Sequence, residues 1–148
     1  MKIKIFALTH KKFEVPQDKM YQPLQVGREG KEDLGYLCDN TGDNISAENC
    51  YYSELTGLYW IWKNVHAYKY VGTCHYRRYL LNEQEKIFTE TEYLELLKDY
   101  DLITTKRVVL NNSYHYGFAT NHNIHALDMT GEVIKEIYPE YYDTFVQL

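Results

Sequence analysis

A short apolar run near the N-terminus limits the folds that this chain can adopt. Residues 2–8 first alternate and then become continuously apolar, and the run stops at the polar residues 9–12, Thr-His-Lys-Lys. This length and pattern predict a buried strand of a parallel sheet that ends in a polar loop. In an open α/β sheet the carboxyl end of such a strand is a ligand edge. Thr9 and His10 are therefore candidate ligand-binding residues.

One long helix is predicted after the densest cluster of turn-forming residues. Residues 39–44 read Asp-Asn-Thr-Gly-Asp-Asn, and Ser46 follows as a suitable N-cap. Glu48 lies in the first turn, where the helix dipole favours an anion. We expect a helix from near Ala47 to about His66. Its predicted core-facing stripe consists of apolar residues at steps of four, three, four and three: Tyr51, Leu55, Leu58, Trp62 and Val65.

Strands and helices alternate along the first two thirds of the chain. A second strand is predicted over residues 68–74, a short helix over 91–98 and a further strand over 100–105. Residues 13–38 contain two of the three prolines and predict mostly loop, with one short strand at 21–26. This alternation favours a Rossmann-like α/β fold, with a mostly parallel sheet, right-handed crossovers and flanking helices.

The last third of the chain has a different pattern. Residues 111–120 are polar and aromatic, and we predict irregular structure there. Residues 121–138 have helical spacing, and Pro139 is expected to open a final helical turn through Val146.

Composition narrows the class of protein. With 148 residues, 45% of them hydrophobic, the chain is expected to form one domain over residues 1–148. The net charge of -5 provides no basic field for nucleic acid, so no nucleic-acid partner is predicted. The three cysteines lack a C-x-x-C spacing, which indicates neither a disulfide framework nor a zinc knuckle. The apolar start is too short for a signal peptide or membrane span, and a cytoplasmic location is expected.

A cationic and aromatic segment follows the second predicted strand. His75, Tyr76 and Tyr79 flank Arg77 and Arg78 where α/β domains bind ligands. A guanidinium fork suits the oxygens of a diphosphate. Alternatively, one arginine pairs with a carboxylate of the acidic stretch at residues 83–85. Adjacent side chains on a strand point oppositely, so only one arginine is expected to face a pocket.

Two other candidates have ordinary structural alternatives. The loop of residues 39–46 ends at a predicted helix N-terminus, where Asp43, Asn44 and free backbone N–H groups could receive an anion or sugar hydroxyls. The same residue types serve any turn and cap. Glu54 could be a catalytic base, or a solvated or arginine-paired carboxylate.

A metal site is weakly indicated. His122 and His125 lie one helical turn apart with His115 nearby, but no cysteine or carboxylate completes the set. Asp99 and Asp101 have the spacing by which many nucleotide-sugar transferases hold a divalent ion. They lie at the entrance of a predicted strand, opposite the ligand edge, and we interpret them as a helix-to-strand turn.

Three ordered motifs resemble an uncharacterised-domain family found in bacterial gene clusters for capsule, exopolysaccharide and lipopolysaccharide. They are TGDNIS at residues 41–46, SELTGLYWIWKN at 53–64 and YVGTCHYRRYL at 70–80. IFALTHK at residues 5–11, YQPLQVG at 21–27 and YPEY at 138–141 fit the same pattern. The resemblance therefore covers nearly the whole chain.

This resemblance implies a single-domain, A-type, nucleotide-sugar-dependent glycosyltransferase that builds bacterial surface polysaccharide. It implies a nucleotide-sugar donor, a glycan or lipid-linked glycan acceptor, and a cytoplasmic protein that associates peripherally with the inner face of the membrane. The family pattern singles out nine residues here: Asp43, Asn44, Glu54, Trp60, Lys63, Asn64, His75, Arg77 and Arg78.

We assign roles to these residues as expectations. Glu54 and His75 are the catalytic candidates. The substrate-binding candidates are Thr9, His10, Asp43, Asn44, Trp60, Lys63, Asn64, Arg77, Arg78 and Tyr79. Transferases of this kind normally carry an acidic metal motif after the middle strand, where this chain reads HYRRY. We therefore expect arginine to replace the metal as counter-charge of the diphosphate. No cofactor is predicted, and a divalent metal remains open.

The chain also departs from the family pattern. Members usually continue with a further strand and the acceptor side, whereas this sequence stops at Leu148. We expect a donor-binding part, incomplete at its C-terminus, whose exposed sheet edge or apolar patch favours a homodimer. The alternative function is a non-catalytic nucleotide-sugar-binding or assembly module, and the sequence leaves enzyme activity open.

Overall fold

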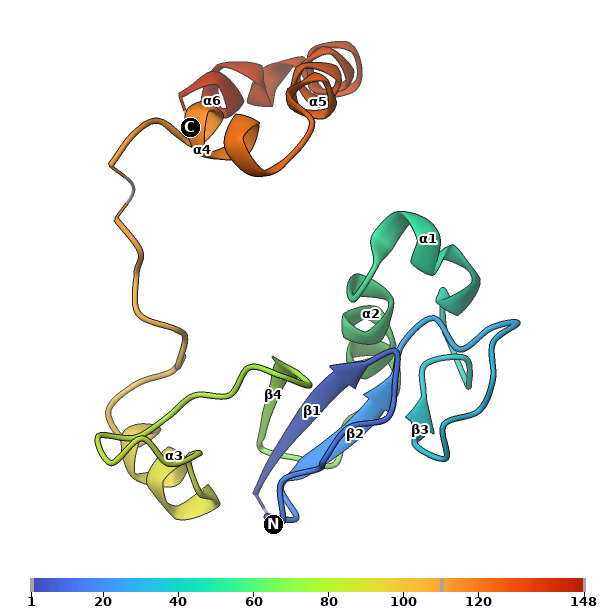
Figure 1. Cartoon of the computed structure of the whole chain (residues 1–148), viewed down its shortest axis with the longest axis vertical. Helices are drawn as coiled ribbons and strands as arrows, with labels where there is room; N and C mark the ends of the chain where they lie inside the picture. Colours follow the sequence, from blue (N-terminus) through green and yellow to red (C-terminus); the bar gives the residue numbers. More distant parts are fainter. Residues whose placement is uncertain (1, 110, 148) are drawn as a thin grey trace. The chain divides into compact units, whose positions relative to one another are not determined.

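Two compact units make up the chain. The computed structural model describes residues 2–109 and 111–147. Unit 1 extends to Thr104, and unit 2 begins at Thr105. Unit 1 contains a sheet with helices, whereas the regular structure of unit 2 is helical (Figure 1).

A four-stranded parallel sheet forms the centre of unit 1. Its order is β3-β2-β1-β4, and every neighbouring pair is parallel. The expected α/β fold with a parallel sheet is therefore confirmed. The two-residue strand β3 lay in a segment for which only one strand was predicted. The strands are β1 (Ile3–Thr9), β2 (Tyr21–Gln25), β3 (Leu37–Cys38) and β4 (Tyr70–His75).

Both faces of β1 are covered, because alternate residues of this central strand enter two different cores. On one face, Phe6 and Leu8 pack with Trp60 and Ile61 of helix α2 (Leu55–Asn64). On the other face, Ile3 and Ile5 share a core with Met20, Tyr21 and Tyr93, the last from helix α3 (Glu90–Leu96). A strand buried on both faces reads as a continuous apolar run, which explains the pattern of residues 2–8.

The predicted long helix is broken into three pieces. They are η1 (Ser46–Glu48), α1 (Asn49–Tyr52) and α2 (Leu55–Asn64). The break lies at Ser53, whose φ is 50°, outside the right-handed helical region. The Asn49 side chain donates a hydrogen bond of 2.6 Å to the Ser53 carbonyl and stabilises the break. The helical region begins near Ala47 as predicted, but the prediction of one continuous helix to about His66 is wrong.

The predicted core-facing stripe of this helix is also wrong. Leu55 is 54% exposed and Trp62 is 67% exposed, and of the five stripe residues only Val65 packs against the core. A Cβ at Gly57 would lie 2.6 Å from Val26 Cγ1, so the glycine permits close approach of α2 to the sheet. The face that packs on the sheet consists of Thr56, Gly57, Trp60 and Ile61.

The strand predicted over residues 100–105 does not form. Tyr100 is 62% exposed and Leu102 is 77% exposed, so these side chains have no sheet-like burial on two faces. Within the described residues β4 is the last strand on its side of the sheet. The helix predicted over residues 91–98 is confirmed as α3, which begins with a capping box between Thr89 and Glu92.

Unit 2 consists of short helices around one longer helix. Ser113 accepts a hydrogen bond from the Tyr116 N–H at 3.2 Å and caps α4, so the prediction of irregular structure over residues 111–120 is wrong. The helix and final turn predicted after residue 121 are confirmed. Each helix among the described residues is too short or too polar to span a lipid bilayer. The elements are α4 (Tyr114–Asn121), α5 (Ile124–Ile137), η2 (Pro139–Tyr141) and α6 (Tyr142–Val146).

A buried carboxylate joins the separate pieces of unit 1. Asp39 is 0% exposed and directly follows β3. Its oxygens accept backbone hydrogen bonds from Gly27 at 2.7 Å and Arg28 at 3.0 Å. They also accept from the hydroxyls of Ser46 at 2.6 Å and Thr56 at 2.7 Å. A buried charge is tolerated when it is fully hydrogen-bonded, and this one connects the end of β2 to η1 and α2.

Replacing this carboxylate is expected to destabilise the fold strongly. Asp39→Ala leaves two backbone donors and two hydroxyls without their acceptor, and we expect the free energy of unfolding to fall by about 3 kcal/mol or more. Urea denaturation followed by circular dichroism measures this change. The exposed Asp101→Ala provides the control and should change stability by less than about 0.5 kcal/mol. Equal effects of the two substitutions would contradict the role given to Asp39.

Candidate functional site

Two adjacent strands deliver candidate residues to the same end of the sheet. Strand β1 ends at Thr9 and β4 at His75, and Leu8 pairs with His75 in the parallel register. The Tyr76 N–H donates a 3.1 Å hydrogen bond to the Leu8 carbonyl, which extends the pairing beyond β4. The segments that begin at His10 and at His75 therefore start from adjacent positions at this end of the sheet.

Both arginines of the second segment face solvent. The Arg78 N–H donates to the His75 carbonyl at 2.9 Å, so residues 75–78 form a tight turn. Because the two arginines lie in a turn, the strand alternation expected for them does not apply, and both are exposed. Among the residues that the structure describes, no carboxylate lies within ion-pair distance of either guanidinium. The alternative pairing with the acidic stretch at 83–85 is not formed.

The ring of Tyr76 holds the two segments together. Tyr76 is 6% exposed, and its ring contacts those of His10 and His75 at centroid distances of 5.6 Å and 4.3 Å. The Lys11 ammonium lies 5.4 Å from its centroid, and the Arg77 guanidinium lies 5.1 Å from it. Such cation–π contacts are attractive, so one buried ring positions cations from both strand ends.

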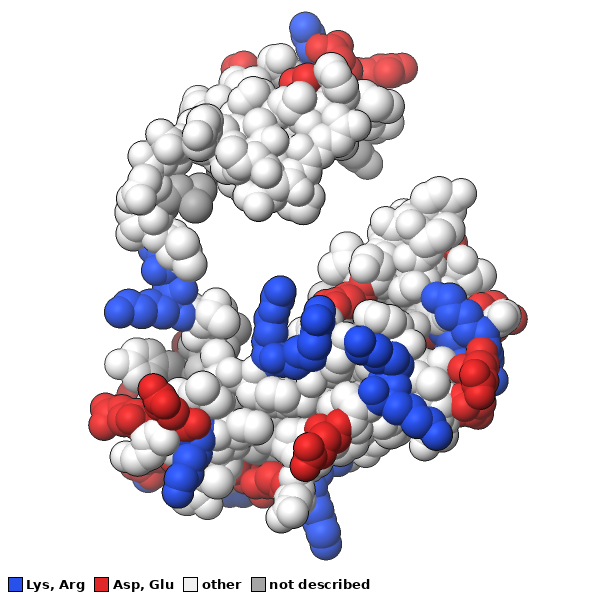
Figure 2. Space-filling view, viewed as in Figure 1, with Lys and Arg blue, Asp and Glu red and all other residues white. Residues whose placement is uncertain are grey.

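We name the group of Lys11, Arg77 and Arg78 the cationic edge. Figure 2 shows Lys and Arg side chains close together over the end of the sheet at which β1 terminates. Fixed positive charge at the carboxyl ends of parallel strands suits an anionic ligand.

The two predicted catalytic residues lie in contact. His75 Nε2 is 3.3 Å from Glu54 Oε1, and His75 Nδ1 accepts a 3.2 Å hydrogen bond from the Arg77 N–H. Since Nδ1 is an acceptor, the neutral ring carries its proton on Nε2, the nitrogen that lies beside Glu54. Burial lowers the pKa of His75; Glu54 opposes this shift, and the charges of Arg77 and Arg78 add to it. The arrangement is a neutral imidazole that orients a half-exposed carboxylate.

Helix α2 fastens the backbone of the loop at residues 41–46. The Trp60 Nε1–H donates to the Thr41 carbonyl at 2.8 Å. The Asn64 side chain donates to the Asp43 carbonyl at 2.8 Å and accepts from the Asp43 N–H at 3.3 Å. Gly42 has φ 58°, and a Cβ there would lie 2.2 Å from Asn64 Oδ1. The structure therefore uses Trp60 and Asn64 to shape the loop.

The polar side chains of this loop differ in what they contact. Asn44 bonds within the loop, to the Gly42 carbonyl at 3.0 Å and the Ser46 N–H at 3.1 Å. The Asp43 carboxylate is exposed; it accepts from the Tyr59 hydroxyl at 3.0 Å and lies 3.9 Å from Lys63 Nζ. Asp43 and Lys63 are thus the members of this group that face solvent together.

Two other predicted binding residues, Thr9 and Tyr79, stabilise the backbone that follows β1 and β4. Thr9 is 1% exposed, and its hydroxyl bonds to the Lys11 N–H and carbonyl at 3.1 Å and 2.5 Å, which shapes the turn after β1. The Tyr79 hydroxyl donates to the Tyr76 carbonyl at 3.1 Å, and its ring packs on Tyr21. Burial raises the pKa of Tyr79 to about 12. Both side chains are engaged within the fold.

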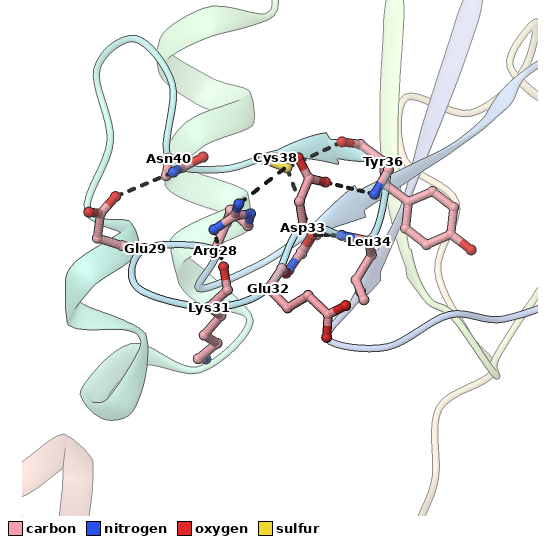
Figure 3. Close-up of polar contacts among 11 residues, drawn as sticks. Arg28, Glu29, Lys31, Glu32, Asp33, Leu34, Tyr36, Cys38 and Asn40 are labelled. Atoms are coloured by element: carbon pink, nitrogen blue, oxygen red, sulfur yellow. Dashed lines mark hydrogen bonds and ion pairs between the residues drawn. The ribbon is translucent and has the colours of Figure 1, made fainter.

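A further arginine near the strand ends is committed to its own loop. Arg28 donates to the Lys31 carbonyl, lies 3.9 Å from the Asp33 carboxylate and approaches the Cys38 thiol (Figure 3). Glu29 and Asn40 close the same loop with a 3.3 Å hydrogen bond. Arg28 therefore stabilises the β2–β3 connection. Its guanidinium has a carboxylate partner, which neither Arg77 nor Arg78 has among the described residues.

Three important residues were not among the predicted site residues: Lys11, Asp39 and Tyr76. Lys11 and Tyr76 directly follow predicted site residues at strand ends, and that adjacency could have identified them. Asp39 has no such signal, since an Asp before a turn is ordinary. Among the described residues, no three His, Cys, Asp or Glu side chains group as metal ligands, so the histidines at 115, 122 and 125 form no such set.

Comparison with known proteins gives a family and a structural relative. Residues 4–148 match the family described as Domain of unknown function (DUF4422). A solved structure described as the WbbM bifunctional glycosyltransferase in its apo form is similar, with 27% identity and a TM-score of 0.75. The match covers 95% of this chain and 30% of that one. No curated protein sequence matches significantly. The expected glycosyltransferase-like fold is thereby confirmed.

The titration of His75 should make stability depend on pH. Because the folded pKa is lowered, the unfolded chain binds a proton below about pH 6.5 that the folded chain binds less readily. We expect stability to fall as the pH drops from about 7.5 through 6.5. Urea unfolding at a series of pH values should give a smaller slope for His75→Gln. Parallel slopes for the two proteins would contradict the lowered pKa, which an NMR titration of the ring measures directly.

Proposed function

This chain belongs to the DUF4422 family, and we propose that it is a glycosyltransferase module whose cationic edge binds the diphosphate of a nucleotide-sugar donor. The observation that carries the proposal is the pair Arg77 and Arg78, both exposed and without a carboxylate partner among the described residues, at the carboxyl end of β4. The similarity to a glycosyltransferase structure supports the same class of ligand.

A guanidinium pair suits the demands of a diphosphate leaving group. Each guanidinium offers a planar set of donors that matches phosphate oxygens, and its charge is permanent. When the bond between the sugar and the diphosphate breaks, negative charge grows on the departing oxygen. Arg77 and Arg78 then stabilise the transition state more than the bound donor, which is the condition for catalysis. In this proposal the arginines supply the counter-charge that a metal ion often supplies.

Glu54 is the proposed proton acceptor for the hydroxyl of the acceptor glycan, and His75 holds it in place. The Glu54 carboxylate takes the proton of an acceptor hydroxyl, whose oxygen bonds to the sugar carbon as the sugar–diphosphate bond breaks. The electron pair of that bond leaves with the diphosphate. His75 holds the carboxylate through the 3.3 Å contact and remains neutral because its pKa is lowered.

The remaining assignments follow from the same proposal. Asp43 holds hydroxyls of the donor in a loop that Asn44 shapes, and His10 lines the edge after β1 in a turn that Thr9 shapes. The acceptor is a glycan or lipid-linked glycan of bacterial surface polysaccharide, handled in the cytoplasm at the inner face of the membrane. The three sequence motifs described above support this context.

Donor binding can be tested by thermal shift with UDP- and GDP-sugars. Wild type should show a raised melting temperature with at least one donor. Arg77→Ala combined with Arg78→Ala should weaken binding by at least about tenfold, since each lost charge-assisted contact contributes about 1.5–3 kcal/mol. Arg107→Ala, an exposed arginine distant in sequence, is the matched control and should bind as wild type does.

The metal-free character of this binding has its own test. Binding should persist in excess chelator, because the guanidiniums supply the counter-charge. Loss of binding with EDTA and its recovery with Mn²⁺ would sink the arginine-for-metal assignment. An unchanged response of the double variant would reject the cationic edge as the donor site.

Turnover separates an enzyme from a binding module. Glu54→Gln should lower the rate of donor hydrolysis or transfer by about 10²–10⁴-fold, the usual contribution of a general base, while donor affinity stays within about twofold. Glu83→Gln is the matched control and should leave both unchanged. Donor binding without any turnover in wild type would favour the non-catalytic alternative.

A further inference from the structure

Unit 2 contains a cavity of its own. Its volume is about 450 Å³, and residues of α4, α5 and α6 line it. From α5 come Leu127, Asp128, Gly131 and Glu132. The other lining residues are Tyr114 and His115 of α4 and Tyr142, Phe145 and Val146 of α6. A cavity of this size is typical of a small-ligand site.

The face of α5 that lines the cavity departs from what helix stability favours. Gly131 lies inside a 14-residue helix, where glycine is less favourable than alanine. Asp128 and Glu132 are four residues apart, and like charges at this spacing repel each other. In the described part of unit 2, His125 Nδ1 lies 3.8 Å from the Asp128 carboxylate, whereas no cation lies within ion-pair distance of Glu132. Such local conflicts are expected where a surface serves a function.

Gly131 keeps the floor of the cavity open. It is buried, and a Cβ at this position would lie 3.0 Å from Cε1 of Phe145. A larger side chain would have to displace that ring or enter the cavity. In contrast, a Cβ at Gly117 of α4 would meet no atom within 4 Å. The two helical glycines of unit 2 therefore differ in what they exclude.

The chemistry of the lining matches a ring that carries hydroxyl groups. Asp128 and Glu132 accept hydrogen bonds, and His115 and the tyrosine hydroxyls can donate or accept them. Phe145 and Leu127 offer apolar surface to the C–H face of such a ring. We propose that this cavity binds a pyranose ring of a glycan.

A cationic ligand fits the same lining less well. The Lys135 ammonium lies 5.3 Å from the centroid of the Tyr142 ring. That aromatic face is already occupied by a positive charge, which repels a second one. A neutral sugar gains the carboxylate acceptors without this repulsion.

The assignment deepens the proposed function and rests on it, because glycosyl transfer requires a glycan acceptor as well as a donor. The donor contacts proposed above lie in unit 1, whereas every residue of this cavity lies in unit 2. The two sites can therefore fail or succeed separately in an experiment.

The test is an NMR titration of the ¹⁵N-labelled full chain with the methyl β-glycosides of glucose, galactose and N-acetylglucosamine. At least one glycoside should shift amide signals of α5 and α6 in a saturable way. Asp128→Asn combined with Glu132→Gln keeps the side-chain volumes and should weaken binding by about tenfold or more. Gly131→Leu should abolish binding, whereas Gly117→Leu, the matched control, should retain it.

The results of this titration test the sugar site in unit 2 and not the proposed donor site in unit 1. Retained binding in both the carboxamide double variant and Gly131→Leu would overturn the proposal, as would the absence of shifts with all three glycosides. Choline chloride as a probe should give no saturable shift; choline binding in place of the sugars would identify a cation site instead. Binding of nucleotide sugars to the same samples, followed by thermal shift, reports on the proposed donor function independently.

Discussion

Unit 1 depends on one buried charge. The Asp39 carboxylate accepts two backbone and two hydroxyl hydrogen bonds and is fully removed from solvent. A carboxylate in this position is costly unless it is satisfied, so the groups around it are constrained together. It joins the end of β2 to η1 through Ser46 and to α2 through Thr56. The position of α2 follows from this joint, and with it the places of Glu54 at one end of the helix and Asn64 at the other.

The second constraint is the shared aromatic ring at the ligand edge. Tyr76 contacts groups from both the segment after β1 and the turn after β4, so the cations of the edge are positioned by packing. Mutual repulsion of Lys11 and Arg77 would otherwise separate them, and the face of the ring offsets part of that repulsion. Among the described residues no carboxylate pairs with these cations, so the surface that holds them close together is prepared for an anion.

The regular features of unit 1 could be predicted from sequence, because burial on both faces leaves a local signal. The apolar run of β1 and the strand leading to His75 are of this kind. The course of the chain after Ser46 could not be predicted, since the break at Ser53 depends on a side-chain contact from Asn49. The face of α2 was misjudged because hydrophobic spacing counts Leu55 and Trp62 as core. The packed face instead uses Thr56 for a hydrogen bond and Gly57 for close approach.

The candidate site also combines features that sequence could predict with features that it could not. Glu54, His75 and the two arginines were predicted from sequence motifs, and the structure places them together at one edge of the sheet. Their electrostatic coupling could not be predicted, because it depends on the distances between the folded side chains. The guanidiniums of Arg77 and Arg78 are among the causes that lower the pKa of His75, while Glu54 acts against them. An anion held by those guanidiniums would offset their charge and leave the Glu54 contribution in place. Donor binding would then raise the pKa of His75 back toward its ordinary value, because the anion offsets the two guanidinium charges that help to lower it. In the proposed function, the electrostatics of the cationic edge and of the proton acceptor are therefore one linked system.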